Sequence, residues 1–129
     1  MSQYMLLIYT PTEGGLSPEE GRAEFPKWVA YTEALREAGA LVADNALQGA
    51  ATAATLRVRD GERIVTDGPF AETKETLAGY YVIDVSDREA ALDWAERIPS
   101  APRGSVEVRP VMVFDQADVD AASAGAASA

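Results

Sequence analysis

Residues 79–85, Gly-Tyr-Tyr-Val-Ile-Asp-Val, predict the interior β-strand around which the rest of this chain folds. Side chains of a strand alternate between two faces, so Tyr80 and Val82 point one way while Tyr81 and Ile83 point the other. Both faces of this strand are therefore apolar. If helices cover one face, the other face also needs a cover, and a second copy of the same sheet is the economical one.

The segments after this strand predict a helix and a final strand. Residues 86–89, Ser-Asp-Arg-Glu, have the residue types of a capping box, and the helix that they open is expected to end near Ile98. Residues 105–114 predict the last strand. Pro110 lies inside it and cannot donate a backbone hydrogen bond, which is typical of an edge strand or a bulge.

The N-terminal part of the chain predicts a strand followed by a helix. Residues 4–9 form a strand-like run with apolar side chains on both faces. Ser17 and Glu20 have the spacing of a capping box and predict the start of the helix. Pro26 is expected to break or kink this helix and to leave a main piece over residues 27–38.

The middle of the chain predicts a weak strand and a hairpin. Residues 41–47 form the weak strand, and residues 54–59 and 62–66 flank Asp60-Gly61, a two-residue hairpin signal. With the hairpin taken as an insertion, the order of elements is βαββαβ. This order predicts an α+β, ferredoxin-like fold, in which an antiparallel sheet carries two helices on one face.

Length and composition bound the organisation of the chain. The 129 residues are enough for one folded domain with its own core, which we place at residues 1–114. Residues 115–129 are mainly Ala and Ser with three Asp and lack apolar periodicity, so we expect a disordered acidic tail. The apolar run near the N-terminus is too short for a signal peptide or a membrane helix, so a cytoplasmic protein without membrane contact is expected.

Charge and the missing residue types exclude several function classes. The net charge of −10 and the scattered Lys and Arg residues argue against a nucleic-acid surface. The chain has no histidine and no cysteine, so it cannot form a Ser-His-Asp triad or a His/Cys zinc site. No Gly-rich phosphate loop is present, and we expect no metal, nucleotide or flavin cofactor. Any catalysis would have to use carboxylates, Lys, Tyr or Arg, and whether the protein is an enzyme stays open.

One segment carries alternating charges at a chain corner. Residues 67–70, Asp67-Gly68-Pro69-Phe70, predict a turn, which on a structural interpretation has Phe70 filling the core. On a functional interpretation the turn presents Asp67, or the charges that follow it, to a substrate. The candidate catalytic residues are Asp67, Lys74 and Glu75. Lys74 is a candidate anion anchor or proton-transfer group, and the alternative for it is a solvated ion-pair cluster with its neighbours.

Two charges on the last predicted strand form the second half of the candidate site. Glu107 and Arg109 are two residues apart and therefore share one face of the strand. They could orient a polar ligand or form an ion pair at a subunit interface. The candidate ligand-binding residues are thus Glu72, Lys74, Glu107 and Arg109.

Taken together, the motifs are similar to those of a DGPF-type member of the YCII-related family. The resemblance covers roughly residues 3–114 and rests on six segments, residues 4–9, 35–39, 55–61, 65–75, 79–81 and 106–110. It implies a dimeric α+β barrel, in which two ferredoxin-like sheets pack face to face.

The resemblance implies little about activity. YCII-related proteins are largely uncharacterised, and some were proposed to be enzymes because of a His-Asp pair, which a chain without histidine does not have. Members of the DGPF type are often encoded near extracytoplasmic-function sigma factors. We therefore carry two hypotheses. The protein binds a small polar molecule in a cleft bounded by the first helix, the sheet and the DGPF loop, with acid-base chemistry by a carboxylate or Lys74. Alternatively, it is a non-catalytic homodimer that acts through protein contacts in a pathway linked to such a sigma factor.

Overall fold

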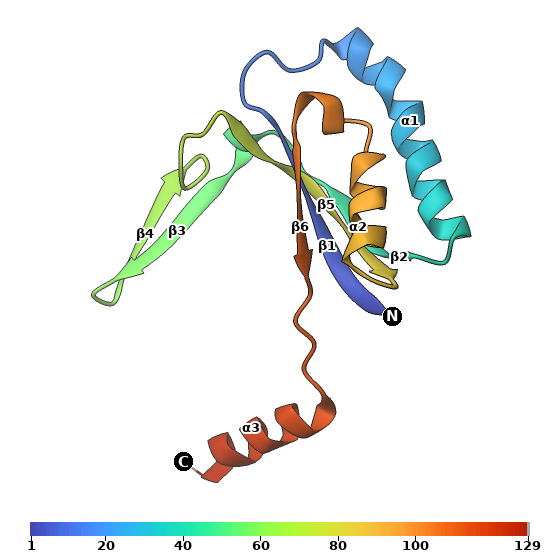
Figure 1. Cartoon of the computed structure of the whole chain (residues 1–129). Coiled ribbons are helices and arrows are strands. Elements are labelled where there is room, and N and C mark those ends of the chain that lie inside the picture. Colours follow the sequence, from blue (N-terminus) through green and yellow to red (C-terminus); the bar gives the residue numbers. More distant parts are fainter. Residues whose placement is uncertain (129) are drawn as a thin grey trace.

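The apolar segments pair into one antiparallel sheet, with two helices on one of its faces (Figure 1). The computed structural model describes residues 1–128. The sheet consists of β1 (Ser2–Pro11), β2 (Leu41–Ala46), β5 (Glu75–Val85) and β6 (Ser105–Pro110), in the order β2-β5-β1-β6. The helices are α1 (Pro18–Glu37) and α2 (Arg88–Glu96). This arrangement confirms the predicted ferredoxin-like α+β fold.

The predicted hairpin forms a separate two-stranded sheet. Its strands are β3 (Ala54–Arg59) and β4 (Glu62–Asp67), which follow a short 3-10 helix, η1 (Ala50–Thr52). Asp60 and Gly61 both have positive φ, 51° and 76°, as a tight hairpin turn requires. In Figure 1 the hairpin leaves the sheet on the side away from α1 and α2. Its strands pair with each other and with no strand of the main sheet.

The core lies between the sheet and the two helices. β1 contributes Leu6 and Ile8, and β5 contributes Tyr81 and Ile83. Leu35 of α1 packs in the same cluster and is fully buried. Burial of these side chains away from water is the main force that holds the helices on this face.

Helix α1 begins where the sequence predicts and continues where it predicts a break. The Ser17 side chain accepts a hydrogen bond from the Glu20 N–H, and the Glu20 carboxylate accepts one from the Ser17 N–H, which confirms the capping box. Pro26 lies inside the helix, so the expected break before Lys27 is wrong. Pro26 is on the exposed side of α1. Proline has no N–H to donate to the carbonyl group four residues earlier in the helix, and water on the exposed side can donate to that carbonyl group instead.

The caps and ends of the later elements differ in detail from the predictions. Helix α2 is capped by Asp87, whose carboxylate accepts from the Ala90 N–H, rather than by a Ser86–Glu89 capping box. Strand β5 begins at Glu75, earlier than expected. Strand β6 ends at Pro110 instead of residue 114 and lies at the edge of the sheet, as the proline predicts. A short 3-10 helix, η2 (Ala101–Arg103), joins α2 to β6.

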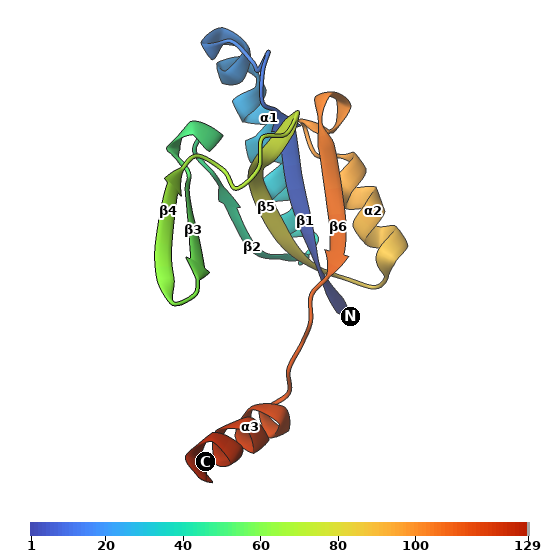
Figure 2. The same ribbon diagram turned by 90° about the vertical axis from the view of Figure 1, so that its left-hand side faces the viewer.

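The C-terminal segment contains a helix that the sequence analysis does not anticipate. The expectation of disorder is corrected by α3 (Gln116–Ser128), which stands apart from the sheet in both views (Figures 1 and 2). Alanine is the strongest helix former, and the Asp115 carboxylate accepts from the Asp118 N–H in the first turn, so local propensity explains the helix. Residue 129 of the expected tail lies outside the described residues. That the domain ends at residue 114 stays a prediction.

Figure 2 views the sheet from the side that neither α1 nor α2 covers. On this helix-free face Met5 is opposite Val82 and Leu7 is opposite Tyr80, and all four side chains are half-buried. Within the described chain, no helix is long and apolar enough to cross a membrane.

Candidate functional site

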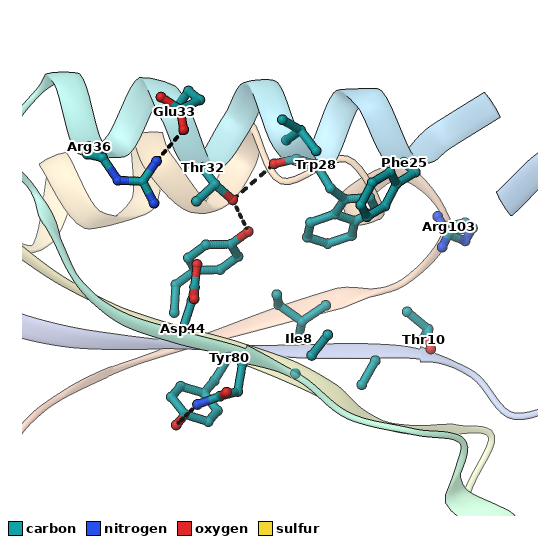
Figure 3. Close-up of a pocket in the computed structure, with 16 residues that line it drawn as sticks. Ile8, Thr10, Phe25, Trp28, Thr32, Glu33, Arg36, Asp44, Tyr80 and Arg103 are labelled. Carbon is teal, nitrogen blue, oxygen red and sulfur yellow. Dashed lines mark hydrogen bonds and ion pairs between the residues drawn. The ribbon is translucent and has the colours of Figure 1, made fainter. Parts of the chain in front are cut away.

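A cleft of about 540 Å³ opens between α1 and the part of the sheet where β2 and β5 pair. Its volume lies in the range of small-molecule sites. Trp28 and Val29 of α1 face Ile8 of β1 across the cleft (Figure 3). Phe25 stands at the mouth with 66% of its surface exposed. The wall of the cleft is therefore largely apolar and aromatic.

Polar groups gather at the opposite end of the cleft. The Thr32 hydroxyl donates to the Trp28 carbonyl at 3.0 Å and lies 2.8 Å from the Tyr81 hydroxyl. Asp44 points from β2 toward α1 beside this pair (Figure 3). Arg36 also lines this end and forms an ion pair with Glu33 one helical turn away. An apolar wall with a few convergent polar groups is the usual design of a small-molecule site.

The position of Trp28 is held by a half-buried carboxylate. Glu24 accepts from the Trp28 indole N–H at 3.0 Å. The same carboxylate accepts two hydrogen bonds from Arg103, at 2.7 and 3.1 Å. Two parallel bonds from one guanidinium fix both the distance and the orientation of the pair. Glu24 thus ties α1 to η2 and fixes one wall of the cleft.

Burial keeps the Tyr81 phenol neutral. Loss of water raises the pKa of Tyr81 above its usual value of 10.0, and the negative charge of Asp44 raises it further. Since the Thr32 hydroxyl donates to the Trp28 carbonyl, the Tyr81 hydroxyl is the donor of the bond between Tyr81 and Thr32.

The sequence-predicted turn lies elsewhere, beside a second cavity of about 600 Å³. Pro69 and Phe70 line this cavity together with Tyr9, Glu75 and Leu77. This turn does not line the cleft under α1. The first helix and the turn therefore border two different cavities, and the single cleft expected between them is corrected to two.

The turn itself is anchored to the hairpin by its backbone. The Gly68 N–H donates to the Ala53 carbonyl at 2.7 Å, and the Thr55 hydroxyl donates to the Gly68 carbonyl at 2.8 Å. Phe70 is 79% exposed, so the expectation that it fills the core is wrong. The turn follows the β3–β4 hairpin, which leaves the sheet on the side away from α1 and α2 (Figure 1), and so lies away from the helix-covered core.

Only one of the predicted charges of this segment borders the second cavity. Glu75 is half-buried, and its carboxylate accepts from the Ser105 hydroxyl at 2.7 Å. Asp67, Glu72 and Lys74 are exposed and do not line this cavity. The Lys74 carbonyl accepts from the Thr12 N–H at 2.8 Å, which fixes its backbone while its side chain extends into solvent.

Glu107 and Arg109 lie on the helix-free face of β6, as their spacing predicts. The Tyr9 hydroxyl donates to Glu107 at 3.3 Å, and the Arg109 Nε lies 4.0 Å from the same carboxylate. Burial and the Glu107 charge raise the pKa of Tyr9 above 10.0. Both charged side chains are largely exposed. They are neighbours of the second cavity through Tyr9 and are separate from the cleft under α1.

Comparison with known proteins places the chain in a family. A model of the YCII-related domain matches residues 2–115. The chain belongs to the YCII-related family. Over 80 residues it is 49% identical to an uncharacterised protein of Rhizobium meliloti (strain 1021). The match covers 60% of this chain and 64% of that relative, slightly less than two thirds of its length.

Sequence reasoning missed the cleft of this YCII-related chain. Four residues that line the cleft were not among the candidate site residues: Trp28, Thr32, Arg36 and Asp44. One signal was available: Asp44 is a charged residue within a predicted strand, and such residues need a reason to be there. The other residues come together only because α1 crosses the edge of the sheet.

Proposed function

We propose that this YCII-related protein binds a small molecule in the cleft between α1 and the β2–β5 edge. The observation that carries the proposal is the aromatic wall formed by Trp28 and Phe25, facing a polar end formed by Asp44 and the Thr32–Tyr81 pair. Trp28 is held in place by Glu24 before any ligand arrives, which lowers the entropy cost of binding.

A cleft-filling variant tests this function. Ala46 is exposed at the end of β2 and lines the cleft, so Ala46→Trp should fill it without disturbing the core. Ala43 is also exposed in β2 but does not line the cleft, and Ala43→Trp is the matched control. A ligand present at about a hundred times its Kd stabilises the folded state by about 2.7 kcal/mol.

Some metabolites should raise the melting temperature of the natural chain and of Ala43→Trp. We expect the same metabolites to leave the melting temperature of Ala46→Trp unchanged. Hits that shift all three proteins equally would place binding outside the cleft and would overturn the proposal.

Chemistry at the second cavity is a further part of the proposal. There Glu75 would act as the carboxylate, with Asp67, Glu72 and Lys74 at the exposed rim. Glu75 supports this role best because its carboxylate is half-buried and borders the cavity. Glu107 and Arg109 would hold a polar group beside Tyr9.

We also propose that two chains form a homodimer through their helix-free faces. The support is apolar surface without a cover: Leu7 and Val82 on the sheet, and Leu56 and Val58 on the hairpin, which are 56% and 60% exposed. Light scattering at low micromolar concentration should give twice the mass of the chain. Leu7→Asp should yield monomers, while Leu16→Asp, outside this face, should not. A folded monomer of the natural chain would contradict the proposal.

The alternative function is that of a non-catalytic dimer which acts through protein contacts, in a pathway linked to an extracytoplasmic-function sigma factor. The exposed apolar side chains of the hairpin favour it. Ala46→Trp separates the two functions, because it abolishes binding in the cleft and leaves the hairpin surface intact.

A further inference from the structure

With one exception, each charged side chain described along the cleft under α1 forms an ion pair with a side chain of opposite charge. Arg36 is paired with Glu33, and Arg103 is paired with Glu24. Asp44 has neither an ion pair nor a hydrogen bond to its side chain within the described residues. Its half-buried carboxylate is thus the one uncompensated charge among the described residues that line the cleft.

The hydrogen-bonding groups beside Asp44 also lack donors. The Thr32 proton is used on the Trp28 carbonyl, and the Tyr81 proton is used on Thr32. The polar end therefore offers acceptors, namely the two Asp44 oxygens and the lone pairs of the Tyr81 oxygen. A ligand group that donates hydrogen bonds and carries positive charge fits these acceptors, while the charge of Arg36 at the same end is paired with Glu33.

We propose that the cleft takes an organic cation, an ammonium group attached to a small apolar or aromatic body. The ammonium group pairs with Asp44, and the body lies against Trp28 and Phe25. This inference rests on the proposed function and names the ligand class for the same cleft. The apolar body gains by burying its surface against this aromatic wall. The net charge of −10 raises the local concentration of cations around the protein.

An anionic ligand fits the same cleft less well. Arg36 would be its anchor, but Glu33 already neutralises Arg36. Arg103, at the other end, holds Glu24 through two hydrogen bonds. An anion at Arg36 would share the guanidinium with Glu33 and would also meet the uncompensated Asp44.

Three probes with one shared body test the inference by titration calorimetry. Phenethylamine, phenethyl alcohol and hydrocinnamate carry a positive, a neutral and a negative group on similar phenylalkyl chains. We expect the amine to bind the natural chain at least about tenfold more tightly than the alcohol, with hydrocinnamate weakest. Added salt should lower the affinity of the protein for the amine and leave its affinity for the alcohol unchanged, because salt screens the ion pair.

Asp44→Asn keeps the shape of the side chain and removes its charge. The tenfold advantage of the amine should disappear in this variant, while the affinity of the alcohol is kept. Asp60→Asn is the matched control, because it changes the net charge equally in the hairpin turn, where asparagine tolerates the positive φ. It should bind all three probes like the natural chain.

The possible results separate the two proposals. If the alcohol binds as tightly as the amine, or hydrocinnamate binds best, the ligand class is wrong while binding in the cleft stands. If Asp44→Asn keeps the advantage of the amine, Asp44 is not the anchor and the inference fails. If no probe binds at millimolar concentration, the inference also fails, and the Ala46→Trp screen decides the proposed function independently. The probe series on the natural chain is decisive even if Asp44→Asn does not fold.

Discussion

Replacing Leu35 with alanine is expected to lower the free energy of unfolding by about 2–5 kcal/mol. Leu35 is fully buried in the core between α1 and the sheet. Truncation removes its apolar surface from the core and leaves a cavity, and both effects destabilise the folded state. Urea unfolding followed by circular dichroism measures the change as a lower midpoint at an unchanged slope.

Leu16→Ala is the matched control. Leu16 precedes the cap of α1 and is 37% exposed. Its truncation should therefore lower the free energy of unfolding by no more than about 1 kcal/mol, well below the loss at Leu35. Equal losses in the two variants would contradict the placement of Leu35 in the core. They would also call into question the position of α1, which forms one wall of the cleft.

Gly104→Ala is the second change with a large expected effect. An added Cβ would lie 2.2 Å from the Tyr9 carbonyl oxygen and 3.3 Å from the Tyr9 carbonyl carbon. These are backbone atoms of β1, and Tyr9 is paired with Ser105 of β6. The new methyl group can be accommodated only if the two strands move apart. We expect a loss of about 1–3 kcal/mol or more, measured by the same unfolding experiment.

Gly21→Ala makes the same chemical change where space is open. Apart from the adjoining backbone of α1 itself, no atom lies within 4 Å of the Cβ that would be added there, and the residue is inside α1. Alanine is the better helix former, so this variant should gain up to about 1 kcal/mol. A loss at Gly21 as large as that at Gly104 would show that the strand contact is not the cause.

The DGPF turn illustrates how an informative sequence motif differs from a site. Its backbone is held by bonds from Gly68 to Ala53 and from Thr55 to Gly68, which join the turn to the base of the hairpin. These bonds support a structural role. A catalytic role for Asp67 stays a prediction, as does a role for Lys74.

Local signals in the sequence determined the elements and their order. The Ser17–Glu20 capping box and the Asp60-Gly61 turn depend on residues close together in the chain, and both are confirmed. The edge position of β6 follows from Pro110, because a proline cannot donate within a sheet. The α+β class follows from the order of these elements.

Local sequence signals gave the wrong secondary structure at Pro26 and in the C-terminal tail. Pro26 is a helix breaker by its own chemistry, yet its exposed position lets α1 continue. The tail lacks apolar periodicity, yet its alanine content favours a helix that stands apart from the sheet.

The set of residues that line the cleft depends on the tertiary structure. Trp28 and Asp44 are far apart in the sequence, and no local pattern links them. They line the same cleft because the core residues of α1 dock on the sheet and the Glu24–Arg103 pair ties the helix to η2. The sequence could therefore predict which residues are buried on each element. Which polar groups share one cavity depends on how the elements cross, and only packing of the whole domain sets that.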